Sequence, residues 1–75
     1  MQWPFKTTLR YQRTDTTVRV QYAVCADNYR ASKDELLRRL AQQEVEGYVI
    51  EQVVAATGRE AAQLNLPDGA VIELA

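Results

Sequence analysis

The sequence predicts a small α+β domain, in which an antiparallel or mixed sheet carries one helix packed on one face. Three observations predict it: apolar–polar alternation over residues 5–26, helical apolar spacing over residues 32–45, and β-rich sequence from residue 48. The expected order is β-β-α-β-β, with one extra short strand if residues 61–66 are extended. Seventy-five residues have room for a single domain, over residues 1–75, with one modest core.

Residues 5–26 predict a β-hairpin with its turn around residues 14–15. Apolar and polar residues alternate along both arms, as in strands with one buried face. Pairing Gln12 with Thr17 brings the apolar residues of both strands to one face, whereas a slip of one residue would divide them between two faces. The side chains predicted on this face are Phe5, Thr7, Leu9, Tyr11, Val18, Val20, Tyr22 and Val24.

A helix is expected to follow. Ser32 and Glu35 have the spacing of a capping box, which predicts the helix start, and Gly47 lies where a C-terminal cap is expected. An apolar stripe at helical spacing predicts the face that covers the sheet: Leu36, Leu37, Leu40, Ala41 and Val45. Acid-before-base pairs are expected on the solvent side: Asp34–Arg38 and Glu35–Arg39.

The last third of the chain is predicted to complete the sheet. Apolar residues occupy both alternating positions in residues 48–54, which predicts a central strand or a strand contacted on its second face. Residues 57–60 are interpreted as a turn, and residues 61–66 fit either a helical turn or the start of a strand. Residues 67–69, Pro-Asp-Gly, favour a turn, so a second hairpin is expected over residues 64–74. The sheet face opposite the helix is expected to have no obvious cover.

Composition excludes several kinds of site. The chain has no histidine and one cysteine, Cys25, so it can form neither an intrachain disulfide nor a Cys/His zinc site. No histidine is available to activate Ser32 or Cys25 as a nucleophile, and the three glycines are too scattered for a phosphate-binding loop. We therefore expect no enzymatic activity, no metal and no cofactor.

The same composition predicts a soluble protein of the cytoplasm. No apolar run approaches the roughly 20 residues needed to span a bilayer, and the N-terminus lacks the features of a signal peptide. No membrane partner is expected.

Charge is unevenly distributed along the chain. Residues 1–30 carry five Lys or Arg against two Asp, and residues 31–75 carry four against eight acidic residues. Such asymmetry marks a binding surface or is neutralised when the halves pack together. In the predicted register Arg10 faces Arg19, and like charges so placed need an anionic neighbour. Glu51, a phosphate backbone or an acidic protein surface could supply it.

Protein binding is the function that these features favour. Trp3 either covers one end of the core or anchors a partner, and an open sheet face with free edges allows face contact or strand addition. The candidate partner-binding residues are Trp3, Lys6, Arg10, Arg13, Arg19 and Gln21. The hypothesis is a non-enzymatic interaction module, an inhibitor or adaptor of the kind that phages and mobile elements encode.

Two alternatives stay open at this stage. The basic outer face of the hairpin could bind nucleic acid, although Tyr11 and Tyr22 are expected to face the core and so leave no stacking platform outside. The chain could also be a homodimer or assembly component joined through its sheet.

Overall fold

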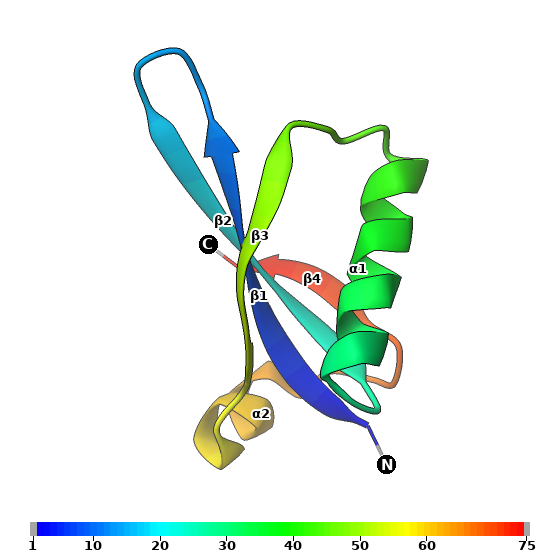
Figure 1. Ribbon diagram of the computed structural model, residues 1–75. Coiled ribbons are helices and arrows are strands. Elements are labelled where there is room, and N and C mark those ends of the chain that lie inside the picture. Colours follow the sequence, from blue (N-terminus) through cyan, green and yellow to red (C-terminus); the bar gives the residue numbers. More distant parts are fainter. Residues whose placement is uncertain (1, 75) are drawn as a thin grey trace.

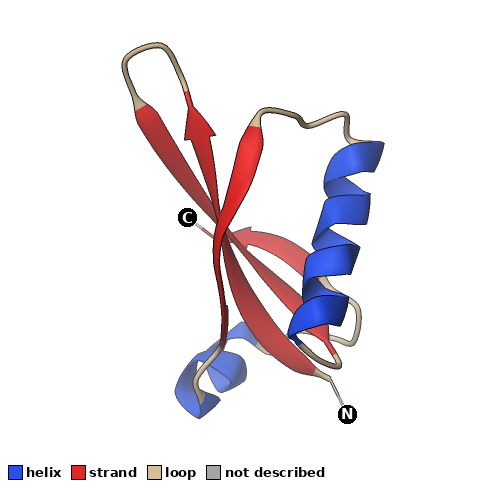
Figure 2. Cartoon of the chain, in the orientation of Figure 1, coloured by secondary structure: helices blue, strands red, loops and turns tan. Residues whose placement is uncertain are grey.

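The computed structural model describes residues 2–74 and contains a four-stranded antiparallel sheet and two helices (Figures 1 and 2). The strands are β1 (Trp3–Gln12), β2 (Thr17–Ala26), β3 (Tyr48–Ala55) and β4 (Val71–Leu74), and the helices are α1 (Tyr29–Gln42) and α2 (Gly58–Leu64). The predicted α+β class is confirmed. A second helix makes the element order β-β-α-β-α-β, and the strand order in the sheet is β3-β1-β2-β4.

The predicted hairpin register is confirmed. Gln12 pairs with Thr17, and Arg10 lies opposite Arg19. Arg13 and Thr16 exchange both backbone hydrogen bonds, at 2.8 and 3.3 Å, which closes the turn over the two residues between them. The alternating pattern determines this register because a slip would move the apolar side chains to the wrong face.

Helix α1 lies across one face of the sheet and covers the core (Figure 1). The core cluster comprises Phe5, Leu9, Val24, Ala26, Leu36 and Leu40. Of the predicted stripe, Leu37 and Val45 are half-buried, whereas Ala41 is exposed. Burial of side chains such as Leu36 contributes roughly 1.5–3 kcal/mol each, so the contact between α1 and the sheet accounts for much of the stability.

The predicted start of α1 is wrong. Asn28 is the N-cap, and its side-chain oxygen accepts a hydrogen bond of 2.8 Å from the Ala31 N–H. Ser32 lies inside the helix, fully buried, and its hydroxyl donates to the Tyr29 carbonyl at 3.0 Å. Asparagine caps a helix as well as serine does, and here it leaves the small Ser32 side chain for a position where α1 packs closely.

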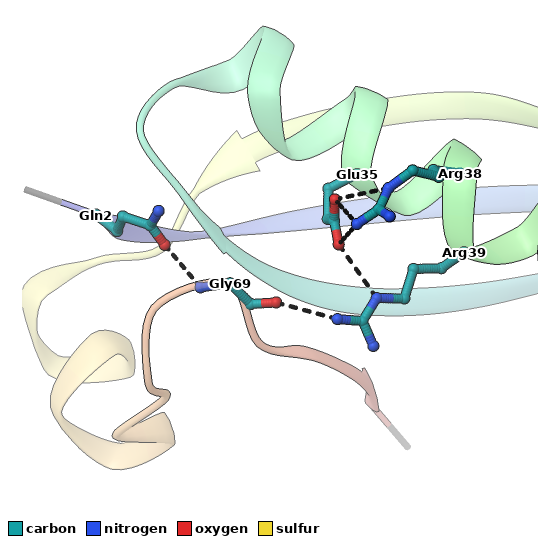
Figure 3. Close-up of polar contacts among 5 residues, drawn as sticks. All are labelled: Gln2, Glu35, Arg38, Arg39 and Gly69. Atoms are coloured by element: carbon teal, nitrogen blue, oxygen red, sulfur yellow. Dashed lines mark hydrogen bonds and ion pairs between the residues drawn. The ribbon is translucent and has the colours of Figure 1, made fainter.

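One of the two expected ion pairs, Glu35–Arg39, forms on the exposed side of α1. Glu35 binds both Arg38, at 2.6 Å, and Arg39, at 3.2 Å. Among the described residues Asp34 forms no ion pair, so the expected Asp34–Arg38 contact is replaced by the contact between Arg38 and Glu35. Figure 3 shows that Arg39 also donates to the Gly69 carbonyl, at 3.4 Å, while the Gly69 N–H donates to the Gln2 side chain, at 2.7 Å. These bonds connect the N-terminus, α1 and the turn before β4.

The end of α1 also differs from the prediction, because Glu44 and not Gly47 occupies the left-handed position. Glu44 has φ = 58°, and its N–H donates to the Ala41 carbonyl at 3.1 Å. The Val45 N–H donates to the Leu40 carbonyl at 2.9 Å. This pair of bonds is a Schellman motif, in which glycine is normally preferred. Gly47, with φ = 78°, lies in the connection to β3.

Replacing Glu44 with glycine is therefore expected to stabilise the domain by about 0.5–1 kcal/mol, because glycine adopts a positive φ without steric strain. Chemical denaturation would measure the change. Glu44→Ala is the matched control, since it removes the same charge and keeps the strain. An equal gain in both variants would show that charge, and not backbone conformation, is responsible.

Strand β3 is an edge strand, so the first of the two predicted alternatives, a central strand, is wrong. A β-bulge interrupts its pairing with β1: Leu9 lies opposite Ile50 and Thr8 opposite Gln52, so Glu51 is the extra residue. The bulge shifts the alternation of inward and outward side chains by one residue. Ile50 and Val53, which are three residues apart, therefore both pack against the core, and this is why apolar residues occupy both alternating positions in the sequence.

The expected second hairpin is wrong, and a helix takes its place. Thr57 and Glu60 form a capping box: the Thr57 hydroxyl accepts from the Glu60 N–H at 3.1 Å, and the Glu60 carboxylate accepts from the Thr57 N–H at 3.0 Å. Residues 61–64 therefore continue α2. The Pro67–Gly69 turn does form, with the Ala70 N–H donating to the Pro67 carbonyl at 3.1 Å, but it joins α2 to β4.

Helix α2 lies on the opposite side of the sheet from α1, so that face is not left uncovered (Figure 1). Ala23 and Cys25 point to this face of β2, and both are buried. Strand β4 pairs with β2 from Val24, opposite Val71, to Gln21, opposite Leu74. The outer half of the same sheet face stays exposed.

Candidate functional site

The hairpin of β1 and β2 is longer than its neighbours. Strand β3 reaches only Tyr48, opposite Tyr11, and β4 reaches only Leu74, opposite Gln21. Strand β1 is thus paired with β3 as far as Tyr11, and only Gln12, Thr17 and the turn between them extend beyond both neighbours (Figure 1). Residues 17–20 of β2 have no strand beside them on the β4 side within the described chain. We call residues 11–20 the hairpin arm.

Arg10 and Arg19 lie at the base of the arm on the face away from α1. The Glu51 carboxylate contacts the Arg19 Nε at 2.9 and 3.2 Å and lies 3.9 Å from an Arg10 guanidinium nitrogen. The bulge in β3 places Glu51 on this face. The anion that the two opposed arginines require is therefore supplied from within the chain.

Removal of this carboxylate gives a direct test of the cluster. Glu51→Gln is expected to lower the free energy of unfolding by about 0.5–1 kcal/mol, because Arg10 and Arg19 then repel each other without a counter-ion. The loss should shrink as salt concentration rises. Thermal denaturation at low and high salt would measure it, and Glu51→Gln/Arg19→Gln should recover most of the loss. A loss independent of salt would contradict the electrostatic explanation.

Of the other predicted binding residues, Lys6 and Gln21 share the sheet face of Arg10 and Arg19, whereas Trp3 lies at the far end of β1 and Arg13 at the turn. Lys6 forms an ion pair with Glu60 of α2, and this contact, with the hydrogen bond from the Thr57 N–H, holds the pKa of Glu60 below its usual range. Gln21 and Lys6 border a cavity of about 220 Å³ beside α2. Trp3 lies at the far end of β1, where its indole N–H donates to the Ala56 carbonyl at 2.8 Å.

The structure therefore does not bring the six predicted residues into one patch. Lys6, Arg10 and Arg19 each have a carboxylate within ion-pair distance, and Trp3 is 36% exposed at the end opposite the arm. Of the four cations in this set, Arg13, at the tip of the arm, is the one that forms no ion pair within the described residues. The role of these residues in partner binding stays a prediction.

The sequence predicts free sheet edges without indicating which strand has one, and the outer edge of β2 is such an edge. No strand within residues 2–74 pairs with Thr17–Val20 on the side away from β1. Because Arg13 and Thr16 exchange both hydrogen bonds, alternation makes Thr17 and Arg19 the residues whose N–H and C=O groups point outward. Cys25 obeys the same alternation: its N–H and C=O bond to Ala70 and Gly69, at 2.9 and 3.1 Å. This stretch of β2 offers backbone groups for a further strand.

A groove of about 410 Å³ adjoins this free edge on the face that carries α1. The groove runs between the arm, the residues after α1 and the end of β4, and is lined by Tyr11, Arg13, Val18, Val20, Tyr22, Val45, Glu46 and Glu73. The groove exists because the apolar side chains of β2 continue beyond the end of α1, and Val18 is consequently 37% exposed. We call this groove the tyrosine groove.

The tyrosines of this groove are in an apolar and negatively charged environment. Burial raises the pKa of Tyr11, and the neighbouring Tyr48 and Glu73 raise it further. Burial and Glu73 likewise raise the pKa of Tyr22. Tyr11 and Tyr48 pack edge to face, with ring centroids 6.1 Å apart. The hydroxyls thus stay protonated at neutral pH, and Glu73 is close enough to influence both rings.

Cys25 is a buried free thiol. Burial and the nearby Asp68 raise the pKa of Cys25, so the thiol stays protonated at neutral pH. No group of three or more acidic or cysteine side chains within residues 2–74 is placed to hold a metal ion. Neither α1 nor α2, the helices of this part of the chain, is long and apolar enough to cross a membrane.

Comparison of the chain with protein-family models, with curated proteins and with solved structures finds no match. The free edge of β2 and the tyrosine groove are therefore the candidate functional features of the described chain.

Proposed function

We propose that this domain is a protein-interaction module that adds an extended segment of its partner to the free edge of β2. The observation that carries the proposal is the coincidence of outward backbone groups at Thr17 and Arg19 with an apolar groove on the adjoining face. In strand addition, backbone hydrogen bonds provide affinity and pockets for alternate side chains provide specificity. Both elements are present here.

The edge of β3 is less suited to this role. Strand β3 contains a bulge at Glu51, and both a bulge and a charge discourage edge-to-edge pairing. The free edge of β2 at residues 17–20 has no proline, and β2 has no bulge in its pairing with β1. Val18 is exposed there, beside the groove.

A protein partner fits the charge distribution better than nucleic acid does. Nucleic-acid binding depends on cations that are free to displace the counter-ions of phosphates. Here Arg10 and Arg19 already share Glu51, and Lys6 is paired with Glu60. The proposal accordingly assigns the arm an inhibitor or adaptor role toward a protein, in the cytoplasm, with no catalytic step.

A selection experiment tests the proposal. Peptides that bind the domain would be selected from a displayed library of random short segments, and their affinity for Thr17→Pro would be measured by calorimetry. Proline removes the outward N–H of Thr17 and is tolerated at the first residue of a strand, so the fold should survive. We expect binding to weaken by about tenfold or more.

Thr17→Val is the matched control, since it removes the hydroxyl and keeps the N–H. It should bind like the wild type, with circular dichroism confirming that both variants fold. Equal affinity of a folded Thr17→Pro variant would overturn strand addition at this edge. A wild-type homodimer that Thr17→Pro dissociates, seen by light scattering, would instead make a second copy the occupant and would also overturn the proposal of a separate partner.

A further inference from the structure

We propose that the tyrosine groove receives a basic side chain, arginine or lysine, from the partner segment that pairs with β2. This inference rests on the proposed function, since the paired segment is what brings the side chain to the groove. It names the chemistry by which the partner is recognised: an extended stretch with one cation at a position that faces α1.

The charges around the groove favour a cation. Glu46 and Glu73 both line it, and within residues 2–74 neither forms an ion pair. The one cation of the lining is Arg13, so one negative charge is left in excess. Arg39 borders an adjoining cavity that shares Tyr22 and Glu73 with the groove. Its guanidinium is engaged by Glu35 and by the Gly69 carbonyl, as Figure 3 shows.

The uncharged lining suits the rest of a basic side chain. Tyr11 and Tyr22 present aromatic rings, whose faces attract Lys and Arg head groups. Val18, Val20 and Val45 supply apolar surface for the aliphatic stem of the same side chain. Because Glu73 raises the pKa of both tyrosines, its charge acts across the groove and not only at its rim.

Strand geometry delivers one side chain to this position. A residue of an added strand that lies opposite Val18 points to the same sheet face as Val18, which is the face of the groove. Its sequence neighbours point to the other face, where Arg19 and Glu51 form their ion pair. The partner segment is therefore expected to carry a basic residue at the position opposite Val18, where an acidic residue is disfavoured.

The peptides selected against the wild-type domain provide the test. We expect a single conserved Arg or Lys flanked by β-branched or aromatic residues, and its replacement by norleucine should weaken binding. Glu46→Gln/Glu73→Gln should weaken binding of the same peptides by about tenfold and abolish the preference for the basic residue over norleucine. Asp34→Asn is the matched control, because it removes an exposed carboxylate of α1 remote from the lining and should leave affinity unchanged.

The outcomes separate the two proposals. Peptides that require the Thr17 N–H but show no basic residue, or that bind the Glu46→Gln/Glu73→Gln variant unchanged, would overturn this inference and leave strand addition standing. Peptides indifferent to Thr17→Pro would overturn the proposed function. Loss of affinity equal in Asp34→Asn and in the double variant would assign the effect to overall charge and would also overturn the basic-residue site.

Discussion

Replacing Leu36 with alanine is expected to lower the free energy of unfolding by about 2–5 kcal/mol. Leu36 is fully buried in α1 and belongs to the core cluster with Leu9 and Val24. Alanine would lose the transfer free energy of the missing atoms and leave a cavity between helix and sheet. A domain of this size has a total stability of only about 4–11 kcal/mol, so the variant should be partly unfolded on warming.

Urea denaturation followed by circular dichroism would measure this loss. Leu37→Ala is the matched control, because Leu37 is the neighbouring leucine of the same helix and is only half-buried. Its replacement should cost clearly less. Equal losses in the two variants would show that α1 does not pack on the sheet through Leu36.

Replacing Thr7 with valine is expected to have the opposite sign, a gain of about 1–2 kcal/mol. Thr7 is fully buried on β1, between Tyr22 of β2 and Val53 of β3, and its hydroxyl has no hydrogen-bond partner. Valine has nearly the same shape and removes the desolvated polar group. The buried face of β1 would then be apolar from Phe5 to Leu9.

The same denaturation measurement applies, with Thr8→Val as its control. Thr8 is the next residue of β1 and lies on the other face, where it is half-buried. Its replacement should change stability by less than about 0.5 kcal/mol. A loss of stability in Thr7→Val would show that the Thr7 hydroxyl is satisfied by a buried water, contrary to the prediction.

These substitutions act on the body of the domain, whereas the proposed binding surface lies on the arm. Helix α1 covers the sheet up to Tyr22 and leaves Val18 and Val20 beside an open groove. The apolar alternation of β2 thus serves both purposes: its inner half builds the core and its outer half lines the groove. A stabilised variant such as Thr7→Val should therefore retain the binding properties of the wild type.

The candidate site is less predictable from the sequence than the fold is. Arg10 and Arg19 were correctly placed opposite each other, and Glu51 was among the anions considered for them. The sequence predicts that Tyr11 and Tyr22 face the core, and both pack against the core cluster, but it does not indicate that they also line a groove. Whether a core-facing residue is covered depends on where α1 ends over the sheet, and no local pattern encodes that position.

A local signal was present for one of the errors. Thr57 and Glu60 have the same capping-box spacing as Ser32 and Glu35, but only Thr57 caps a helix. The spacing alone does not indicate which of the two pairs forms a cap. Ser32 is buried against the sheet, so Asn28, one turn earlier, caps α1 instead.

The sequence by itself determined the β1–β2 hairpin, its register and the amphipathic character of α1. These features depend on contacts between neighbouring or alternating residues, and a wrong register would have exposed apolar side chains. Only the tertiary structure decided that β3 is a bulged edge strand and that β4 pairs with β2 beside residues 21–24 and not beside residues 17–20. Those outcomes depend on which distant backbone groups satisfy one another's hydrogen bonds, and the free edge of β2 is the stretch that they leave without a partner in the described chain.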